Sequence, residues 1–263
     1  MASERAARLA ALYDLDLRDD PGDLDLYRAL ADREAGPVLE LGVGTGRVAV
    51  PLAVAGHSVT GVDDDDAMLA RAAARWERVV AASPGAARGG TLELVHADLL
   101  AVDLGARFAF AFLALNSLFL MGTYERQVAA VRALARHLRP GGLALVDVWL
   151  PSADELAAYD GRLALEWLRP EDDGVHQVAK LGSARLDTSA ATVALTTFFD
   201  RWPTSGGPVE RTSRTDELRL VTAAELTAMA QAAGLTVELL AGDYRMEPFG
   251  PGAERVLLLG RLV

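Results

Sequence analysis

The sequence contains no cysteine and no long apolar run, and each absence excludes a class of protein. Without cysteine, the chain can build neither a disulfide framework nor a metal site with thiolate ligands. No apolar stretch approaches the roughly 18 residues that a membrane helix needs, so we expect no membrane partner. Residues 1–11 also lack the apolar centre of a signal peptide. The expected location is therefore the cytoplasm.

Positive charge is scarce as well. Acidic residues outnumber basic ones by 37 to 26, which gives a net charge of −11. A phosphate backbone would repel such a chain, so we expect no nucleic-acid partner. Hydrophobic residues make up 51% of the 263 residues, enough to fill the core of one large domain with an elaboration.

Short apolar segments alternate with helical patterns through the middle of the chain. Strands are expected at 37–41, 58–62, 91–95, 108–114 and 143–149, and helices at 46–55, 66–81 and 123–138. This alternation predicts an α/β fold whose parallel sheet is covered on both faces. The segment 83–90 is a plain connector, and Arg-Pro-Gly-Gly at 139–142 predicts the end of a helix before the fifth strand.

Both ends of this core carry further elements. The N-terminal part predicts helices at 3–12 and 24–35, the second capped by Asp23. A capping box of Thr222 and Glu225 begins a helix that ends near residue 233. The remaining expected strands are 162–169, 175–186, 191–201 and 210–220, then 235–241 and 254–262.

The four strands between 162 and 220 alternate in polarity and are separated by turn residues, which predicts an antiparallel β flap inserted into the α/β pattern. We therefore predict one domain over 1–263. Its parts are a helical cap at 1–36, a core at 37–150, the insert at 160–221 and a C-terminal part of the core at 222–263.

Three glycines at positions 42, 44 and 46 follow the first core strand. Glycine lets the backbone turn sharply and approach a ligand closely, and the helix after the loop offers free N–H groups. Asp63, at the tip of the next strand, can accept hydrogen bonds from two ribose hydroxyls. The pattern predicts a nucleoside-binding crevice. Arg47 stands where a dinucleotide fingerprint needs its third glycine, and no Walker lysine follows the loop.

These residues, with others further along, resemble the class I S-adenosylmethionine-dependent methyltransferases. The segments similar to the successive motifs of that family are 38–47, 61–63 with 67–69, 96–99, 114–117 and 138–147. The resemblance implies a Rossmann-like, seven-stranded, mostly parallel sheet of order 3-2-1-4-5-7-6 with strand 7 antiparallel. It also implies S-adenosyl-L-methionine as methyl donor and S-adenosyl-L-homocysteine as product.

The resemblance assigns roles to single residues. Glu40 would orient the glycine loop or reach the amino group of the cofactor through water, and Asp98 would accept from the adenine amine. Leu115 and Asn116 would lie under the sulfonium. The full set expected to bind the cofactor is Tyr13, Glu40, Gly42, Gly44, Thr45, Gly46, Arg47, Asp63, Asp64, Met68, Ala97, Asp98, Leu99, Leu115 and Asn116.

Within the class, the sequence is more similar to small-molecule N-methyltransferases such as the amino-sugar dimethyltransferases and glycine N-methyltransferase. Tyr-Asp at 13–14 and Gly-Asp-Tyr at 242–244 match segments of those enzymes. The Asn-Pro-Pro-Tyr signature of DNA amino methyltransferases is absent at 114–117, which again argues against a nucleic-acid substrate. The resemblance thus favours a small-molecule acceptor.

Methyl transfer is an in-line displacement, so the enzyme mainly holds the acceptor atom about 3 Å from the methyl group in a dry site. A general base is needed only when the acceptor arrives protonated, and the candidates are Tyr13, His176 and Tyr244. Candidate acceptor-binding residues are Phe119, Trp149, Trp202, Arg219, Tyr244 and Arg245. The aromatic residues suit an amine, the arginines a carboxylate or phosphate, and the sequence leaves both open. No His/Asp cluster has the spacing of metal ligands, so no metal is expected.

Two other functions stay open at this point. One is a regulatory protein that binds S-adenosylmethionine without turnover. The other is a nicotinamide-dependent oxidoreductase, which Arg47 disfavours. The acceptor atom, whether nitrogen, oxygen or carbon, is open too. The short strands of the flap offer edges through which two copies could pair as a homodimer.

Overall fold

The computed structural model describes residues 2–19, 21–82 and 89–263, and these form two compact units. The core unit consists of Asp19–Leu150 and Val221–Val263, and the flap unit of Met1–Arg18 and Pro151–Leu220. Most of the predicted connector 83–90 lies outside the described residues. The division of one domain into cap, core, insert and C-terminal part stays a prediction.

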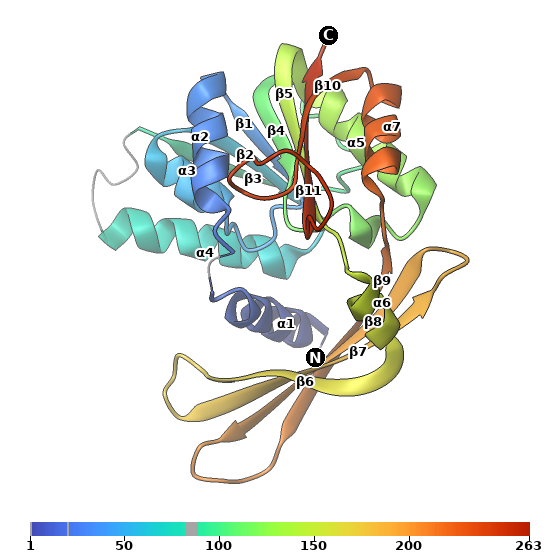
Figure 1. Cartoon of the computed structure of the whole chain (residues 1–263). Helices are drawn as coiled ribbons and strands as arrows, with labels where there is room; N and C mark the ends of the chain where they lie inside the picture. Colours follow the sequence, from blue (N-terminus) through green and yellow to red (C-terminus); the bar gives the residue numbers. More distant parts are fainter. Residues whose placement is uncertain (1, 20, 83–88) are drawn as a thin grey trace. The chain divides into compact units, whose positions relative to one another are not determined.

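The core unit contains a seven-stranded sheet in the order β10-β11-β5-β4-β1-β2-β3 (Figure 1). Its strands are β1 Val38–Leu41, β2 Ser58–Asp63, β3 Thr91–His96, β4 Phe108–Leu113, β5 Leu138–Trp149, β10 Leu235–Ala241 and β11 Arg255–Leu262. Neighbouring strands run parallel except that β11 is antiparallel to both β5 and β10. Counted along the core, this is the predicted order 3-2-1-4-5-7-6 with strand 7 antiparallel, so the Rossmann-like fold class is confirmed.

Helices cover both faces of this sheet, which explains why its central strands are buried throughout. Every residue of β1 and of β4 is buried. Helices α2 (Leu24–Glu34), α3 (Ala49–Ala55) and α4 (Asp66–Ala82) share one hydrophobic cluster with the sheet, and α5 (Tyr124–His137) and α7 (Ala223–Ala232) cover the other face (Figure 1). Among the described helices, none is long and apolar enough to cross a membrane.

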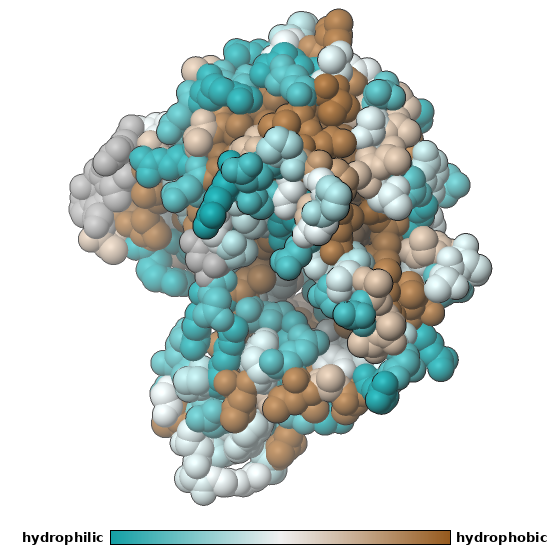
Figure 2. Space-filling view, in the orientation of Figure 1, coloured by the Kyte–Doolittle hydropathy of each residue, from teal (hydrophilic) through white to brown (hydrophobic). Residues whose placement is uncertain are grey.

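The flap unit is a four-stranded antiparallel sheet with two helices. Its strands β6 (Asp160–Pro170), β7 (His176–Asp187), β8 (Thr192–Pro203) and β9 (Glu210–Arg219) pair in chain order, which confirms the predicted antiparallel insert. Helix α1 (Ala2–Asp16) packs on this sheet through a small cluster of Leu12, Leu15, Val178 and Phe199. The edge strand β6 exposes leucines at 163, 165 and 168, and Figure 2 shows hydrophobic residues over that strand.

Four local predictions differ from the structure. Helix α3 begins at Ala49 and not at 46, because the glycine loop continues to residue 48. Strand β5 begins at Leu138 and not at 143, since 138 pairs with β4 before a bulge. Helix α6 (Ala153–Ala158) was not predicted, although its capping box of Ser152 and Glu155 is visible in the sequence.

The fourth difference concerns Asp23, which precedes α2 but makes no side-chain capping bond. Its carboxylate instead accepts two hydrogen bonds from Arg47, at 2.7 and 2.5 Å. The prediction that Asp23 caps the helix was therefore wrong. A fully buried carboxylate is stabilised far more by a guanidinium than by one backbone N–H.

Candidate active site

The glycine loop leaves β1 and lies against the end of β2. The N–H of Gly42 donates to the Val62 carbonyl at 2.8 Å, and that of Gly44 donates to Asp63 Oδ2 at 2.8 Å. Gly46 has φ +73°, and a Cβ there would come within 3.0 Å of the Val50 side chain. The residue must be glycine because its backbone conformation and its close packing both exclude a side chain.

Asp63 is the half-buried last residue of β2. Its Oδ1 accepts from the Asp65 N–H at 3.0 Å and its Oδ2 from Gly44. Burial raises the pKa of Asp63, while these two N–H groups lower it. Each carboxylate oxygen has two lone pairs, so the side chain keeps the capacity to accept two more hydrogen bonds. Asp65 caps the next helix, since its Oδ1 accepts from the N–H groups of Ala67 and Met68.

Glu40 is a carboxyl group buried beneath the glycine loop, 3% exposed. Burial raises its pKa to about 8, although Arg47 and the Ala49 N–H lower it. Within the described residues, Glu40 Oε2 and the hydroxyl of Thr45 are buried without a hydrogen-bond partner. Each such atom costs about 1–3 kcal/mol when nothing compensates it. Two unpaired oxygens beside one loop are the mark of a site that receives a polar ligand.

The tip of β3 lies beside that of β2. The N–H of Ala97 donates to the Asp63 carbonyl at 2.9 Å, and the His96 ring lies 3.0 Å from both the Asp64 carbonyl and the Asp66 carboxylate. Asp98 is exposed, and one of its oxygens accepts from the Leu100 N–H at 2.8 Å. The half-buried Met68 and Leu99 complete the predicted adenine side, with Asp64 exposed next to it.

The tip of β4 adjoins the glycine loop from the other side. Leu115 and Asn116 have φ +41° and +63°, a left-handed conformation that non-glycine residues rarely adopt. Asn116 Oδ1 accepts from the Trp149 N–H at 2.6 Å. A Cβ on Gly42 would lie 3.4 Å from Ser117 Oγ, so the loop and this tip are in contact. The structure thus brings the expected cofactor residues of the core unit together at one edge.

Asp147, a fully buried acid near the end of β5, was not predicted as a site residue. Arg255 donates to its Oδ1 at 2.6 Å, while the hydroxyls of Tyr244 and Tyr27 donate to its Oδ2 at 3.1 and 3.3 Å. Burial raises the pKa of Asp147, and Arg255 and Tyr244 lower it. The sequence did contain a signal that could have indicated Asp147, namely an acid inside the apolar run 143–148.

The expected acceptor residues lie in different parts of the structure. In the core unit, Trp149 and Tyr244 are half-buried, Arg245 is exposed and Phe119 is only 1% exposed, within the hydrophobic core. Burial and the neighbouring Asp147 raise the pKa of Tyr244.

The other candidates belong to the flap unit: Tyr13 on α1, His176 at the start of β7, Trp202 on β8 and Arg219 at the end of β9. Trp202 lines a cavity of about 360 Å³ on this sheet. Arg219 donates to the Leu220 carbonyl at 3.2 Å.

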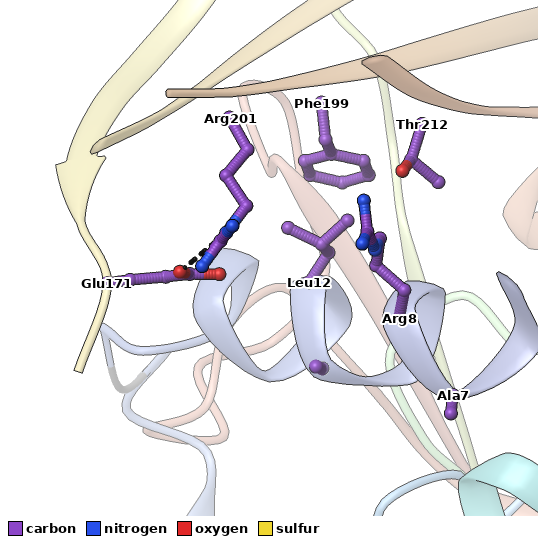
Figure 3. A pocket seen from close by; sticks show the side chains of 8 residues that line it. Ala7, Arg8, Leu12, Glu171, Phe199, Arg201 and Thr212 are labelled. Atoms are coloured by element: carbon purple, nitrogen blue, oxygen red, sulfur yellow. Dashed lines mark hydrogen bonds and ion pairs between the residues drawn. The ribbon is translucent and has the colours of Figure 1, made fainter. Parts of the chain in front are cut away.

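His176 lies in a charged cluster with Glu171 and Asp173, whose ligand atoms are all within 4.8 Å of one another. The sequence spacing did not indicate this cluster. Arg201 already provides a positive charge there, since it contacts Glu171 at 2.8 Å and Asp173 at 3.2 Å. Figure 3 shows the adjoining cavity of about 370 Å³, in which Arg201, Phe199 and Arg8 line the space between α1 and the sheet.

Comparisons with known proteins agree with this geometry. A family model described as a methyltransferase domain matches residues 38–142. The cypemycin N-terminal methyltransferase of a Streptomyces species is 29% identical over 224 residues, which cover 84% of this chain and 81% of that protein.

Two solved structures extend the likeness over nearly the whole chain. The CcbJ methyltransferase from Streptomyces caelestis is 26% identical with a TM-score of 0.72, and the match covers 94% of this chain and 98% of that one. An amino pentose methyltransferase from Micromonospora echinaspora, solved with S-adenosylmethionine bound, shares the fold with a TM-score of 0.69 at 22% identity, over 96% of this chain and 97% of that one. The ordered motifs, the sheet and these likenesses agree with one another, and together they support S-adenosylmethionine-dependent methyl transfer by a chain with the class I methyltransferase fold.

Proposed function

We propose that this enzyme methylates a nitrogen atom of a small-molecule acceptor, with S-adenosylmethionine as donor. The relative with 29% identity is named as an N-terminal methyltransferase. A similar structure at 24% identity, with a TM-score of 0.71, is that of a sugar N-methyltransferase from a Streptoalloteichus species, and it supports the fold. Oxygen is the alternative acceptor atom.

The residues at the edge of the core unit fit the cofactor. The buried oxygens of Glu40 and Thr45 lack partners among the described residues, and Asp63 has capacity for two further hydrogen bonds. In the proposal, Asp63 binds the ribose hydroxyls, Asp98 the adenine amine and Glu40 the amino end. When bound, the cofactor supplies a methyl group on a sulfonium, which needs no further activation. The chain therefore has only to bind, orient and exclude water.

The proposal that nitrogen is the acceptor atom rests on the hydrogen bond and the protonation state of Tyr244. Its hydroxyl donates to Asp147, and burial with that neighbouring charge raises its pKa. It therefore stays a phenol at neutral pH, which makes this ring a poor base for a hydroxyl acceptor. A neutral amine needs no base before it attacks, because it loses its proton after the methyl group has been transferred.

Candidate acceptor-binding residues are proposed for each unit by itself. In the core unit, the half-buried rings of Trp149 and Tyr244 provide aromatic faces that suit an amine. Arg245 stays a candidate for an acidic group of the acceptor. In the flap unit, the candidates are Tyr13, His176, Trp202 and Arg219, with Tyr13 and His176 retained as candidate bases. We also propose a cytoplasmic location and a homodimer, with no nucleic-acid partner.

The test is a transfer assay with methyl-deuterated S-adenosylmethionine and a panel of paired acceptors. Each pair contains an amine and the matching alcohol, built on amino sugars and on short peptides with free or acetylated N-termini. We expect mass label only in amines. Label in the alcohols would contradict the choice of nitrogen. An Asp63→Asn variant should lose transfer, whereas Glu93→Gln, on the exposed face of β3, should keep it.

A further inference from the structure

Asp147 is a buried carboxylate whose partners come from several elements of the core unit. Tyr27 lies on α2, Arg255 begins β11 and Tyr244 follows β10. The Arg255 guanidinium also lies 4.6 Å above the Tyr244 ring, which holds that ring in place. A buried acid is tolerated only when its charge is paired and its lone pairs are used. Here both conditions are met by groups that converge on one carboxylate.

The same acid also holds the tip of β4. The Leu115 N–H donates to the Asp147 carboxylate, and the Asn116 N–H donates to the Asp147 carbonyl at 3.1 Å. Both residues of the tip are left-handed, and such conformations persist only where surrounding contacts enforce them. The hydrogen bonds to Asp147 are contacts of this kind. They oppose the strain, which is larger for Leu115, because asparagine tolerates the left-handed region better.

The tip that Asp147 holds is in contact with the glycine loop through Ser117 and Gly42. The hydroxyl of Tyr244 donates to Asp147, so its oxygen keeps a lone pair for a hydrogen bond from an acceptor amine. We propose that Asp147 is a positioning residue, which fixes the β4 tip beneath the cofactor and the Tyr244 hydroxyl beside the acceptor. This inference rests on the proposed function, in which Leu115 and Asn116 lie under the sulfonium.

The first test compares two isosteric changes of buried acids. Asp147→Asn removes the charge that holds the tip. Glu34→Gln removes a partly buried charge, whose side chain is 8% exposed, which Arg261 binds at 3.0 and 3.1 Å, and which makes no contact with the tip. Calorimetry with S-adenosylhomocysteine should show affinity about tenfold weaker for Asp147→Asn and unchanged for Glu34→Gln. Equal affinities in the two variants would overturn the inference.

The second test asks whether the effect passes through the strained tip. Glycine adopts the left-handed conformation without strain, so in a Leu115→Gly background Asp147→Asn should lower affinity by no more than about threefold relative to Leu115→Gly alone, a rescue of most of the loss. Absence of that rescue would overturn the inference as well.

Tyr244→Phe tests the acceptor side and leaves the charge of Asp147 paired with Arg255. We expect a fall in kcat/KM for the amine of at least about fivefold, with affinity for S-adenosylhomocysteine unchanged. This variant keeps the proposal testable even if Asp147→Asn does not fold. An unchanged kcat/KM would contradict the proposed placement of the Tyr244 hydroxyl beside the acceptor. Failure of the parent protein itself to bind S-adenosylhomocysteine would contradict the proposed function and is thus distinguishable from failure of the inference.

Discussion

The two sheets of this protein are stabilised in different ways. In the core unit, every residue of the central strands β1 and β4 is buried, and the polar groups Asp63 and Asn116 lie at or just beyond the ends of strands. The strands of the flap unit are largely half-buried or exposed, and ion pairs join its elements, such as Lys180 of β7 with Asp16 of α1 and Arg211 of β9 with Asp200 of β8. The part of the core unit that would bind the cofactor is built from buried backbone. The flap unit instead presents side chains, which can change without altering its backbone. This contrast can be tested at four levels.

The largest expected effect comes from the two hydrophobic cores. Phe112 is fully buried, with the Tyr27 and Phe110 rings at 4.7 and 5.2 Å. Phe112→Ala should lower the free energy of unfolding by about 3–5 kcal/mol. Phe199→Ala should lower it less, because the flap cluster is small and Phe199 is already 6% exposed. Urea unfolding of both variants measures this, and equal losses would contradict the contrast.

The next effect concerns binding. Asp63→Asn should weaken the binding of S-adenosylhomocysteine by about 1.5–3 kcal/mol, because a charged acceptor of hydrogen bonds is lost. Asp200→Asn is the matched change in the flap, where the carboxylate pairs with Arg211 and its side chain is 16% exposed. It should leave the affinity unchanged. Calorimetry on both variants measures their affinities for S-adenosylhomocysteine. Similar losses of affinity would contradict the contrast between the two units.

The two units should respond to pH in opposite directions. Burial raises the pKa of Glu40 from 4.5 to about 8, so the folded core binds its proton more tightly than the unfolded chain does. Glu40 therefore contributes stability below pH 4.5 that is lost as the pH rises through 8. In the flap, the Val175 N–H and the His176 side chain lower the pKa of Asp173 from 3.8 to about 2. Its contribution is present above pH 3.8 and is lost as the pH falls through 2.

The measurement is urea unfolding between about pH 2 and 8, which covers the titration of both groups. Glu40→Gln should remove part of the decline toward high pH, and Asp173→Asn should remove part of the decline toward low pH. If the free energy of unfolding depended on pH in the same way in Glu40→Gln and in the parent, the pKa of Glu40 would not be raised by folding.

The smallest expected effect on stability comes from two equivalent capping boxes, one in each unit. Thr222 with Glu225 caps α7, which buries Leu226 and Met229, whereas Ser152 with Glu155 caps α6, which buries none of its residues. Thr222→Ala should lower the free energy of unfolding by about 1 kcal/mol. Ser152→Ala should cost less, because an exposed helix that frays loses little packing. Thermal melts of the two variants test this, and a larger loss for Ser152→Ala would be the contradicting result.

The sequence predicted the elements of both units well, for different physical reasons. Core strands such as β4 are recognisable by their continuous apolar runs, and flap strands by their alternation. The sheet order came from the resemblance and not from the residue pattern, because periodicity carries no information on which strands are neighbours. The start of β5 was missed because Pro140 and Gly141 usually end an element, whereas here they lie in an exposed, bulged stretch of strand.

The buried ion pairs could not be predicted. Asp23 and Arg47 are 24 residues apart, and Asp147 and Arg255 are 108 apart, so only the tertiary fold shows that they meet. In the sequence, Asp23 was interpreted as a helix cap and Asp147 as the last residue of a family motif. The roles of the site residues in binding stay predictions, and the Asp63 and Asp147 variants are the most direct tests of them.

The place of α1 also has a consequence for how the protein is made. Asp16, at the end of that helix, binds Trp167 and Lys180, which follow it by 151 and 164 residues. A ribosome therefore releases the first helix long before its binding surface exists. Since local contacts form first and distant ones wait for loop closure, the core strands β1 to β5 emerge and can pair while α1 is still undocked. Helix α1, which is synthesised before the core strands, is thus among the last elements to reach its final position.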